Sequence, residues 1–465
     1  MAKKDENVDS FRDRVTSIDE SGKRNWVYAF KPSGRYYNAR TWLSFAFLIF
    51  FFAMPFVKVN GHPVFLFNIL ERKFILFGKI FWPQDFFLFG FAMITGFVFI
   101  IVFTVVFGRL FCGWVCPQTI FMELVFRKIE YWIEGTATQQ KLLDKADWNF
   151  EKIRKKLSKW IVFFAISFLI SNAFLSYIIG IDELFAIITE PPSQHAAGLS
   201  AMLLFSGVFF FVFAWFREQA CTVVCPYGRL QGVLLDKNSI VVAYDYVRGE
   251  PRGKAKAAEQ VFGDCIDCDL CVKVCPTGID IRNGTQLECT NCTACIDACD
   301  SIMDKVSRPR GLIRYASESQ IAENKPFAWS MRIKAYSVVL IGLLVVLTSL
   351  LMSRTNLDVT IIRVPGQLFQ EKEDGQISNL YNIKLLNKTF EDLTIELVNE
   401  DGLGTVEWIG KDSIVVPGEG QIQATFFLSI PAEKLNSRKT KLRMNIYSEG
   451  KLIDRVKTNF LGPVK

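Results

Sequence analysis

Eight cysteines in one short stretch of the chain have a spacing that suits iron–sulfur chemistry. They form two copies of the pattern Cys-x2-Cys-x2-Cys-x3-Cys. Three closely spaced thiolates hold three corners of a [4Fe–4S] cluster, and in two-cluster ferredoxins the fourth cysteine of each run ligates the other cluster. We therefore expect one cluster on Cys265, Cys268, Cys271 and Cys299, and a second on Cys289, Cys292, Cys295 and Cys275.

Zinc binding is the competing interpretation of these cysteines. Two such runs in tandem are not a zinc pattern, because structural zinc sites use four ligands from two short pairs. Pro276 follows Cys275, as in bacterial ferredoxins, whereas Asp300 follows Cys299 in place of a second proline. This difference removes no ligand, so two clusters and a role in electron transfer remain the prediction.

The other four cysteines form a second kind of motif, which also occurs twice. Each copy reads Cys-x3-Cys-Pro and follows an arginine at the end of an apolar stretch. Residues four apart share a helix face, so each pair could present two sulfurs side by side. Proline after the second cysteine suits the first turn of a new helix. The two copies comprise Arg109, Cys112, Cys116 and Pro117, and Arg217, Cys221, Cys225 and Pro226.

Four sulfurs at a membrane surface are open to three interpretations. Soft ligands favour Cu(I), zinc or an iron–sulfur centre, so the first interpretation is a copper site. The second is a third iron–sulfur centre or a dithiol relay. The third is plain burial at helix ends, because free cysteine often packs as a small hydrophobe. Duplication at matching positions weighs against the third. In the first, the catalytic metal ligands are Cys112, Cys116, Cys221 and Cys225.

No other cofactor motif accompanies the cysteines. The sequence has no Rossmann fingerprint, P-loop or Cys-x-x-Cys-His haem motif. His62 and His195 are the two histidines, and both read as ordinary loop residues. The chain itself therefore offers no site for NAD, flavin or haem.

Apolar segments indicate that a membrane positions these motifs. Hydrophobic residues make up 50% of the 465 residues, and a transmembrane helix needs about 20 apolar residues. The net charge of +7 is explained by basic residues beside the apolar runs, without nucleic acid. Five segments qualify as spans: Thr41–Val57, Phe86–Phe107, Trp160–Gly180, Gly198–Phe216 and Tyr336–Met352.

One further apolar stretch, Val64–Phe81, is interrupted by Glu71, Arg72 and Lys73. We expect an interfacial or re-entrant segment there, with a sixth span as the alternative.

The distribution of basic residues orients the spans. Lys and Arg are frequent in the N-terminal arm and between the second and third spans, and the stretch Ile181–Ala197 has none. Basic loops stay in the cytoplasm, so the N-terminus and all cysteines are expected in the cytoplasm. A fifth span then places the C-terminal part on the outer side of the membrane. Cytoplasmic thiols stay reduced, which suits thiolate ligands.

The C-terminal part has the pattern of an immunoglobulin-like β-sandwich. Apolar and polar residues alternate in short runs separated by turn signals such as Pro417-Gly418. We interpret this part as a docking module. The expected fold is a multidomain membrane protein: an all-α transmembrane bundle, a bacterial-ferredoxin-like 2[4Fe–4S] domain and a β-sandwich. The domains are an N-terminal arm (1–40), a membrane domain with both Cys-x3-Cys-Pro motifs (41–235), the ferredoxin-type domain (236–330), the fifth helix (331–354) and the sandwich (355–465).

The combination of these motifs resembles a known family, the cytochrome c oxidase accessory proteins CcoG, also called FixG or RdxA. The similarity runs from about Tyr36 to the end, and its most specific parts are CPTGIDIRNG and CIDACDSIMDK. The resemblance implies a cupric reductase of a bacterial inner membrane, with the sandwich in the periplasm, for assembly of the cbb3-type cytochrome oxidase. Its partners would be oxidase subunits or copper-delivery proteins, with an unknown electron donor. By the same resemblance, the membrane cysteines would bind copper and the ferredoxin cysteines would supply electrons.

Two other functions remain open. Quinol-linked polyferredoxin subunits share the Cys-x3-Cys-Pro pairs and the clusters but lack the outer domain. A non-enzymatic scaffold that holds copper for delivery would also use these sulfurs. The outer sandwich favours some partner in every case.

Overall fold

The computed structural model describes residues 16–18, 21–59, 61–69, 73–253, 262–366, 368–373, 375–400, 402–410, 414–435 and 437–463. Residues 1–15 of the expected N-terminal arm, and Glu71 and Arg72 of the interrupted apolar stretch, lie outside the described residues. Contacts divide the chain into two compact units, one formed by Met1–Val57 with Phe91–Val345 and the other by Lys58–Gly90 with Val346–Lys465.

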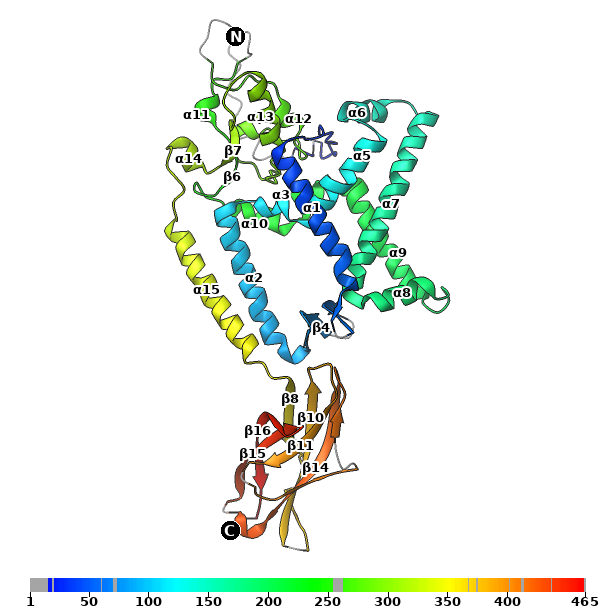
Figure 1. Cartoon of the computed structure of the whole chain (residues 1–465), viewed down its shortest axis with the longest axis vertical. Helices are drawn as coiled ribbons and strands as arrows, with labels where there is room; N and C mark the ends of the chain where they lie inside the picture. The colour runs from blue at the N-terminus through cyan, green and yellow to red at the C-terminus, as the bar shows by residue number, and fades with distance from the viewer. Residues whose placement is uncertain are drawn as a thin grey trace. The chain divides into compact units, whose positions relative to one another are not determined.

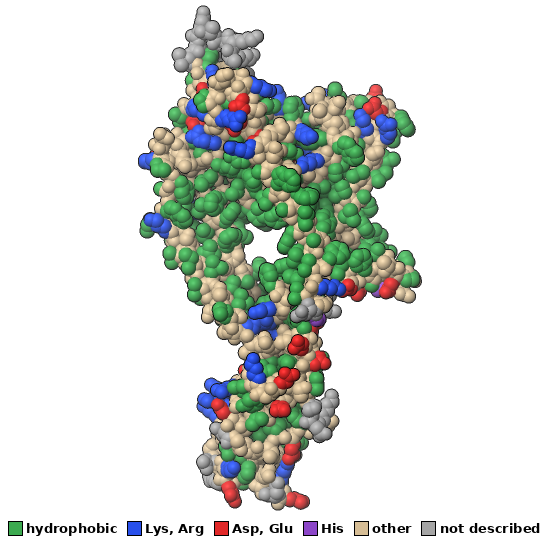
Figure 2. Space-filling model, viewed as in Figure 1, with side chains coloured by type: hydrophobic (Ala, Val, Ile, Leu, Met, Phe, Trp, Pro, Cys, Tyr) green, Lys and Arg blue, Asp and Glu red, His purple; other side chains and the backbone are tan. Residues whose placement is uncertain are grey.

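Five helices of the described residues are long and apolar enough to cross a membrane, as the sequence predicts. Their apolar side chains cover the helix surfaces (Figure 2). The helices are α1 Arg35–Ala53, α2 Phe86–Phe107, α7 Phe150–Ile179, α9 Ala196–Phe211 and α15 Met331–Met352, with α1 and α9 extended by η1 Met54–Phe56 and η4 Val212–Phe216.

Polar residues explain why α7 begins ten positions before the expected apolar span. Asn149 is the N-cap, and its side chain accepts the backbone N–H of Lys152 at 2.8 Å. Such a cap satisfies one of the free N–H groups at a helix start. Helix α7 then packs along α9 (Figure 1), with Phe126, Phe163 and Phe213 in a shared aromatic core.

The ferredoxin-type part of the first unit is small and lies around a two-stranded sheet. Strand β6 Val241–Tyr244 pairs antiparallel with β7 Ile313–Ala316, and helices α12 Leu270–Lys273 and α13 Ala294–Lys305 pack together. Asp297 of α13 also caps membrane helix α1, because its carboxylate accepts the N–H groups of Tyr36 and Tyr37 at 3.1 and 2.8 Å. The start of α1 is thereby attached to a helix that carries predicted cluster ligands.

The second unit contains the expected β-sandwich, with a buried core between two antiparallel sheets. Tyr381, Phe426 and Met444 are fully buried in it. One sheet has the order β12 Thr405–Trp408, β14 Gln421–Pro431, β10 Gln376–Asn387, β8 Leu357–Arg363, with β9 Gln370–Glu371 also paired to β10. The other has the order β13 Ile414–Val416, β11 Leu393–Asn399, β15 Lys439–Ser448, β16 Lys451–Leu461.

The stretch Val64–Phe81 differs from its expected form. It folds as a three-stranded antiparallel sheet of β3 Phe65–Asn68, β4 Lys73–Leu76 and β5 Lys79–Phe81, preceded by the short pair β1 Lys58–Val59 and β2 His62–Pro63. The alternative of a sixth span is therefore wrong. Phe77 and Gly78 join β4 to β5 with φ of 52° and 70°, which is the two-residue turn that favours a hairpin over a helix.

The small sheet and the sandwich form one unit, and this agrees with a five-span topology. The small sheet follows one candidate span and the sandwich follows five. Segments separated by an even number of spans lie on the same side of a membrane.

A buried carboxylate connects the two parts of this unit. Asp85, in the single turn η2 Pro83–Asp85, has 5% side-chain exposure; its Oδ1 lies 2.7 Å from Nζ of Lys388 and its Oδ2 2.8 Å from Nη2 of Arg354. Burial would raise the pKa of Asp85, but the hydrogen bonds and charges of Lys388 and Arg354 outweigh it and lower the pKa below its usual value of 3.8. Asp85 is therefore ionised and stabilises the unit.

We expect Asp85→Asn to destabilise this unit by about 3–5 kcal/mol, because it leaves two buried cations without their partner. The midpoint of thermal unfolding of the purified protein measures the loss. A carboxylate with a lowered pKa stabilises fully above its unfolded pKa, and that contribution disappears as the pH falls below 3.8. The difference between variant and wild type should therefore shrink in acid.

Asp358→Asn is the matched control, since Asp358 also faces Lys388, at 3.7 Å, but is 40% exposed. Its removal should cost about 0–1 kcal/mol. Equal midpoints for Asp85→Asn and the wild type at neutral pH would contradict the role given to Asp85.

Candidate functional site

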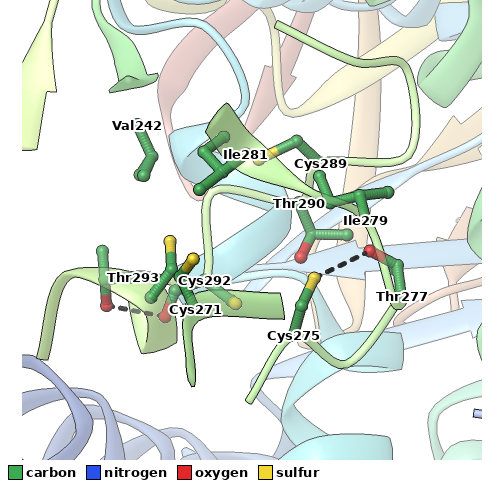
Figure 3. Close-up of a pocket in the computed structure, with 11 residues that line it drawn as sticks. Val242, Cys271, Cys275, Thr277, Ile279, Ile281, Cys289, Thr290, Cys292 and Thr293 are labelled. Carbon is green, nitrogen blue, oxygen red and sulfur yellow. Dashed lines mark hydrogen bonds between the residues drawn. The ribbon is translucent and has the colours of Figure 1, made fainter. Parts of the chain in front are cut away.

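The eight ferredoxin-type cysteines line two cavities. Cluster cavity 1 has a volume of about 370 Å³ and is lined by four of them. Cluster cavity 2, which Figure 3 shows, has a volume of about 340 Å³ and is lined by five. Each contains three cysteines from one run and the fourth from the other, as the sequence predicts for its cluster. The cysteines are Cys265, Cys268, Cys271 and Cys299 in cavity 1, and Cys275, Cys289, Cys292, Cys295 and the shared Cys271 in cavity 2.

The backbone around the two cavities repeats in the same way as the cysteines. The residues on either side of the second cysteine in each run have positive φ, at 56° and 57° for Asp267 and Asp269 and at 53° and 63° for Asn291 and Thr293. Left-handed backbone is uncommon outside glycine and marks functional sites where the surroundings hold it in place. Thr293 is the most unusual of the four, because β-branched residues rarely adopt it.

Burial makes most of these thiols reluctant to ionise without a metal. It raises the pKa of Cys271, Cys289 and Cys299 to about 12. Cluster binding must therefore displace protons from these sulfurs, because metal ligands bind as thiolates. Cys268 is the exposed member of the eight, so one edge of cavity 1 reaches the protein surface. The residues fit two clusters, and the ligand assignment stays a prediction.

The four remaining cysteines come together from two separate parts of the chain. Cys112 lies in α3 Leu110–Trp114 and Cys221 in η5 Ala220–Val224. Cys116 and Cys225 are the N-caps of α4 Pro117–Thr119 and α10 Pro226–Leu234, so each motif proline begins a new helix. We name Cys112, Cys116, Cys221 and Cys225 the membrane thiol group.

The sulfurs of the membrane thiol group influence one another. Burial raises the pKa of Cys112 to about 11, and nearby Cys116 and Cys225 contribute to the rise. Burial and the other three cysteines also raise the pKa of Cys221. Among the described residues, no three His, Cys, Asp or Glu side chains stand in positions to hold one metal ion. The mutual effects on pKa show that the four thiols are neighbours. Their side chains would have to rearrange before all of them could bind a single ion.

Gln231 is a residue of this group that the sequence does not reveal. It is fully buried in α10, and its Nε2 donates to Sγ of Cys112 at 3.2 Å. A lone glutamine in a helix has no recognisable spacing, so only the folded chain shows its position.

The membrane thiol group lies beside cluster cavity 2. A β-carbon at Gly113 would stand 2.5 Å from the carbonyl oxygen of Asn291 and 2.6 Å from that of Thr290, so the first motif touches the cavity 2 loop. Trp114 Nε1 donates to the hydroxyl of Tyr315 at 2.9 Å, and that hydroxyl donates to the Asn291 carbonyl at 3.3 Å. Cavity 2 is thus the cluster cavity that adjoins the first motif.

The second motif also faces this loop. A further cavity of about 330 Å³ lies between them, lined by Cys221 and Glu218 on one side and by Thr277 and Thr290 on the other. Both copies of the motif therefore face the loop of cavity 2.

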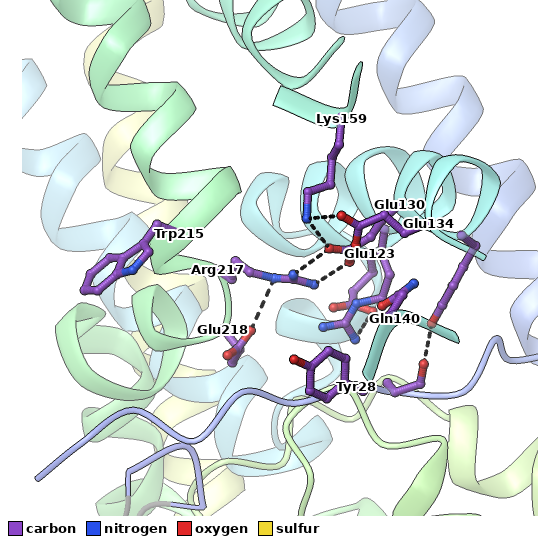
Figure 4. A network of polar contacts seen from close by, with 12 residues as sticks. Tyr28, Glu123, Glu130, Glu134, Gln140, Lys159, Trp215, Arg217 and Glu218 are labelled. Atoms are coloured by element: carbon purple, nitrogen blue, oxygen red, sulfur yellow. Dashed lines mark hydrogen bonds and ion pairs between the residues drawn. The ribbon is translucent and has the colours of Figure 1, made fainter. Parts of the chain in front are cut away.

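A buried ionic network supports the second motif (Figure 4). Arg217, four residues before Cys221, donates through Nη1 and Nη2 to the two carboxylate oxygens of Glu130 at 3.0 and 2.9 Å. Lys159 of α7 lies 3.4 Å from Glu130 and 2.9 Å from Glu134. Burial would raise the pKa of Glu130, but Arg217 and Lys159 outweigh it and lower the pKa to about 2. The network holds α5 Arg127–Ile133 against α7 and fixes the residue that begins the motif.

Comparisons with known proteins agree with this site. Residues 216–318 match the family "4Fe-4S dicluster domain", and residues 89–135, which include Cys112 and Cys116, match the family "4Fe-4S binding domain". Fold and site together define a membrane protein that binds [4Fe–4S] clusters and transfers electrons.

The relatives identify the family within that class. Protein RdxA of Cereibacter sphaeroides is 36% identical over 396 residues, which cover 82% of this chain and 83% of RdxA. Nitrogen fixation protein FixG of Rhizobium meliloti is 33% identical over 420 residues, covering 81% of this chain and 80% of FixG. Residues 347–463 match the family of the IG-like fold at the C-terminus of FixG. The chain belongs to the FixG/RdxA family.

A solved structure is also similar to part of the chain. The crystal structure of a FixG-related protein from Vibrio parahaemolyticus matches 23% of this chain and 97% of its own, at 24% identity and a TM-score of 0.20.

We predict that Gly113→Ala separates the first motif from the cavity 2 loop. Its methyl group would stand 2.5 Å from a backbone oxygen, which cannot move aside as a flexible side chain would. Overpacking of this kind costs about 1–3 kcal/mol. A lower midpoint of thermal unfolding of the purified variant would measure this cost.

Gly207→Ala in α9 is the matched control, because nothing lies within 4 Å of its added β-carbon. The control should unfold at or above the wild-type temperature, since alanine is the better helix former by about 1 kcal/mol. Indistinguishable behaviour of the two alanine variants would contradict the close contact at Gly113.

Proposed function

We propose that the protein reduces Cu(II) to Cu(I) at the membrane thiol group and supplies the Cu(I) for assembly of a cbb3-type cytochrome oxidase. The observation that carries the proposal is the contact between the first motif and the loop of cluster cavity 2. The four sulfurs stand next to one source of electrons. Soft sulfur ligands prefer Cu(I) to Cu(II), so bound copper would be easier to reduce there than in water.

The chain's own residues have defined parts in this reaction. When bound, the clusters supply electrons one at a time. The thiols of the membrane group release protons as they bind copper as thiolates. Burial raises the pKa of two of them, Cys112 and Cys221. Each Cu(II) then accepts one electron and becomes Cu(I). Gln231 orients Cys112 through its hydrogen bond.

The proposal extends to the two sides of the membrane. We place the clusters in the cytoplasm, where thiols stay reduced, and the sandwich in the periplasm. The sandwich would dock oxidase subunits or copper-delivery proteins there. The basic loop between the second and third spans, and the absence of Lys and Arg from Ile181–Ala197, support this orientation.

A third iron–sulfur centre on the membrane thiol group is the second candidate function. One observation favours it: the family "4Fe-4S binding domain" matches residues that include Cys112 and Cys116. Iron content separates the candidates, because two [4Fe–4S] clusters require about eight iron atoms per chain and a third would raise the count to about twelve.

Cys112→Ser and Cys225→Ser test copper reduction directly. Purified protein with reduced clusters is mixed with Cu(II), and cluster oxidation is followed together with trapping of Cu(I) by a chelator. Each variant removes one sulfur of the thiol group. Loss of a residue that only supports a metal ligand typically costs roughly 10–100-fold in metal affinity or activity. Because these variants remove a ligand itself, we expect the rate of Cu(II) reduction to fall by more than that.

Val223→Ala is the control, because Val223 lies between Cys221 and Cys225 and is 38% exposed. It should keep the wild-type rate. Wild-type rates in both serine variants, at unchanged iron content, would refute copper reduction at the membrane thiol group.

A further inference from the structure

Arg40, a buried residue of α1, joins the first motif to the loop of cluster cavity 2. Arg40 belongs to a helix that could span the membrane, and only 3% of the residue is exposed. Nε donates to the carbonyl oxygen of Gly113 at 2.8 Å, and Nη1 donates to that of Cys292 at 2.7 Å. One planar guanidinium therefore contacts both redox elements at once.

Arg109 makes the corresponding connection for the second motif. It is 5% exposed. Its Nη2 donates to the carbonyl oxygen of Gly228 at 2.6 Å, and its Nη1 contacts the carbonyl oxygens of Leu287 and, at 3.3 Å, Cys289. Gly228 is the third residue after Cys225, and a β-carbon there would stand 2.7 Å from the carbonyl oxygen of Cys221. One arginine thus links each motif to the backbone carbonyl oxygen of a cysteine that lines cavity 2.

The hydrogen-bond partners that the structure describes for these two arginines are backbone carbonyl oxygens. Within the described part of the chain, no Asp or Glu forms an ion pair with Arg40 or Arg109, whereas buried Arg217 is paired with Glu130. An unpaired buried charge is costly. A cluster held by four thiolates is an anion, so its presence in cavity 2 would balance both charges.

We propose that Arg40 and Arg109 are positioning residues that make cavity 2 the exit point for electrons. They hold its loop against both motifs, and their positive charge raises the reduction potential of the cluster bound there. Net charge and hydrogen bonding around a cluster set its potential. Electrons then move from cavity 1, which reaches the surface at Cys268, to cavity 2 and on to the membrane thiol group. This order rests on the proposed function for its final acceptor.

The test compares Lys and Gln at both positions in the full-length protein with its clusters. An EPR-monitored redox titration measures the potential of each cluster, and rapid mixing with Cu(II) measures the rate of cluster oxidation. Cys275→Ser identifies which signal belongs to cavity 2, because it changes a predicted ligand of that cluster alone.

Arg40→Gln and Arg109→Gln should lower the reduction potential of the cavity 2 cluster and leave that of the cavity 1 cluster unchanged. They should also slow cluster oxidation by about tenfold or more, because small misplacements of reacting groups have effects of this size. Arg40→Lys and Arg109→Lys should keep the potential near the wild-type value, because the charge remains. Their rate should still fall, because an ammonium cannot reproduce the planar two-carbonyl contact. Charge and position are thereby measured separately.

Arg248→Gln, in the ferredoxin-type domain, is the control. Its partners are the carbonyl oxygens of Pro309 and Arg310 and the carboxylate of Asp264, so it should leave the cavity 2 potential and the rate unchanged. The proposal is overturned if the Gln variants match the wild type in potential and rate, or if both clusters shift equally. If the Gln variants lose iron, the Lys variants become the test. Wild-type rates of cluster oxidation in both Lys variants would then overturn the proposal.

The potentials also separate this proposal from copper reduction. If Cu(II) does not oxidise the wild-type clusters, or does so equally fast in Cys112→Ser, the proposed function fails while the potentials still test the arginines. If wild type and Cys112→Ser differ but the arginine variants do not, only the positioning role fails.

Discussion

The backbone of Gly113 lies against the carbonyl oxygens of Thr290 and Asn291, and the arrangement of the redox site depends on this contact. Electron transfer requires the two centres to be close, and glycine is the residue that allows one backbone to approach another this closely. The hydrogen bonds from Trp114 through Tyr315 to Asn291 cross the same contact. The Asp297 cap on α1 attaches a membrane helix to the same ferredoxin-type part.

Buried ions maintain this geometry at an energetic cost. Desolvation of Glu130, Arg217 and Lys159 is unfavourable, and the pairing of both cations with Glu130 at 2.9–3.4 Å helps to offset it. Replacing such groups by apolar side chains is often neutral for stability, so their value here is in fixing where Arg217, and with it Cys221, stands. Arg40 and Arg109 differ, because carbonyl oxygens are their partners. Their charge remains available to an anion in cavity 2.

The elements with a strong period or spacing could be predicted from the sequence. Five apolar segments are confirmed as candidate spans, and the alternating strands around Tyr381 and Phe426 are confirmed in the sandwich. The spacing of the cysteine runs indicated how the cysteines would group around the two cavities, apart from the shared Cys271, and their roles as cluster ligands stay a prediction. The stretch Val64–Phe81 was harder, since its apolar residues suit both a membrane segment and a sheet. Its partners are also distant in the chain, because Arg354 donates to the carbonyl oxygen of Ile80 and Lys73 pairs with Glu419.

The connections between parts could not be predicted in the same way. Arg40 reads as one of many basic residues near a membrane, and Gln231 has no neighbours that suggest a role. Both act on atoms far away in the chain, Cys292 and Cys112 respectively. Arg109 and Arg217 stand before matching motifs, yet one contacts carbonyl oxygens and the other a carboxylate. Such differences depend on tertiary contacts rather than on local pattern.

Metal analysis combined with EPR of the purified protein, before and after addition of Cu(II), tests the central claim that clusters discharge into copper at the membrane thiol group. The account predicts about eight iron atoms per chain, loss of the reduced-cluster signals when Cu(II) is added, and protein-bound copper that gives no Cu(II) signal. Persistent reduced-cluster signals beside an undiminished Cu(II) signal would contradict it.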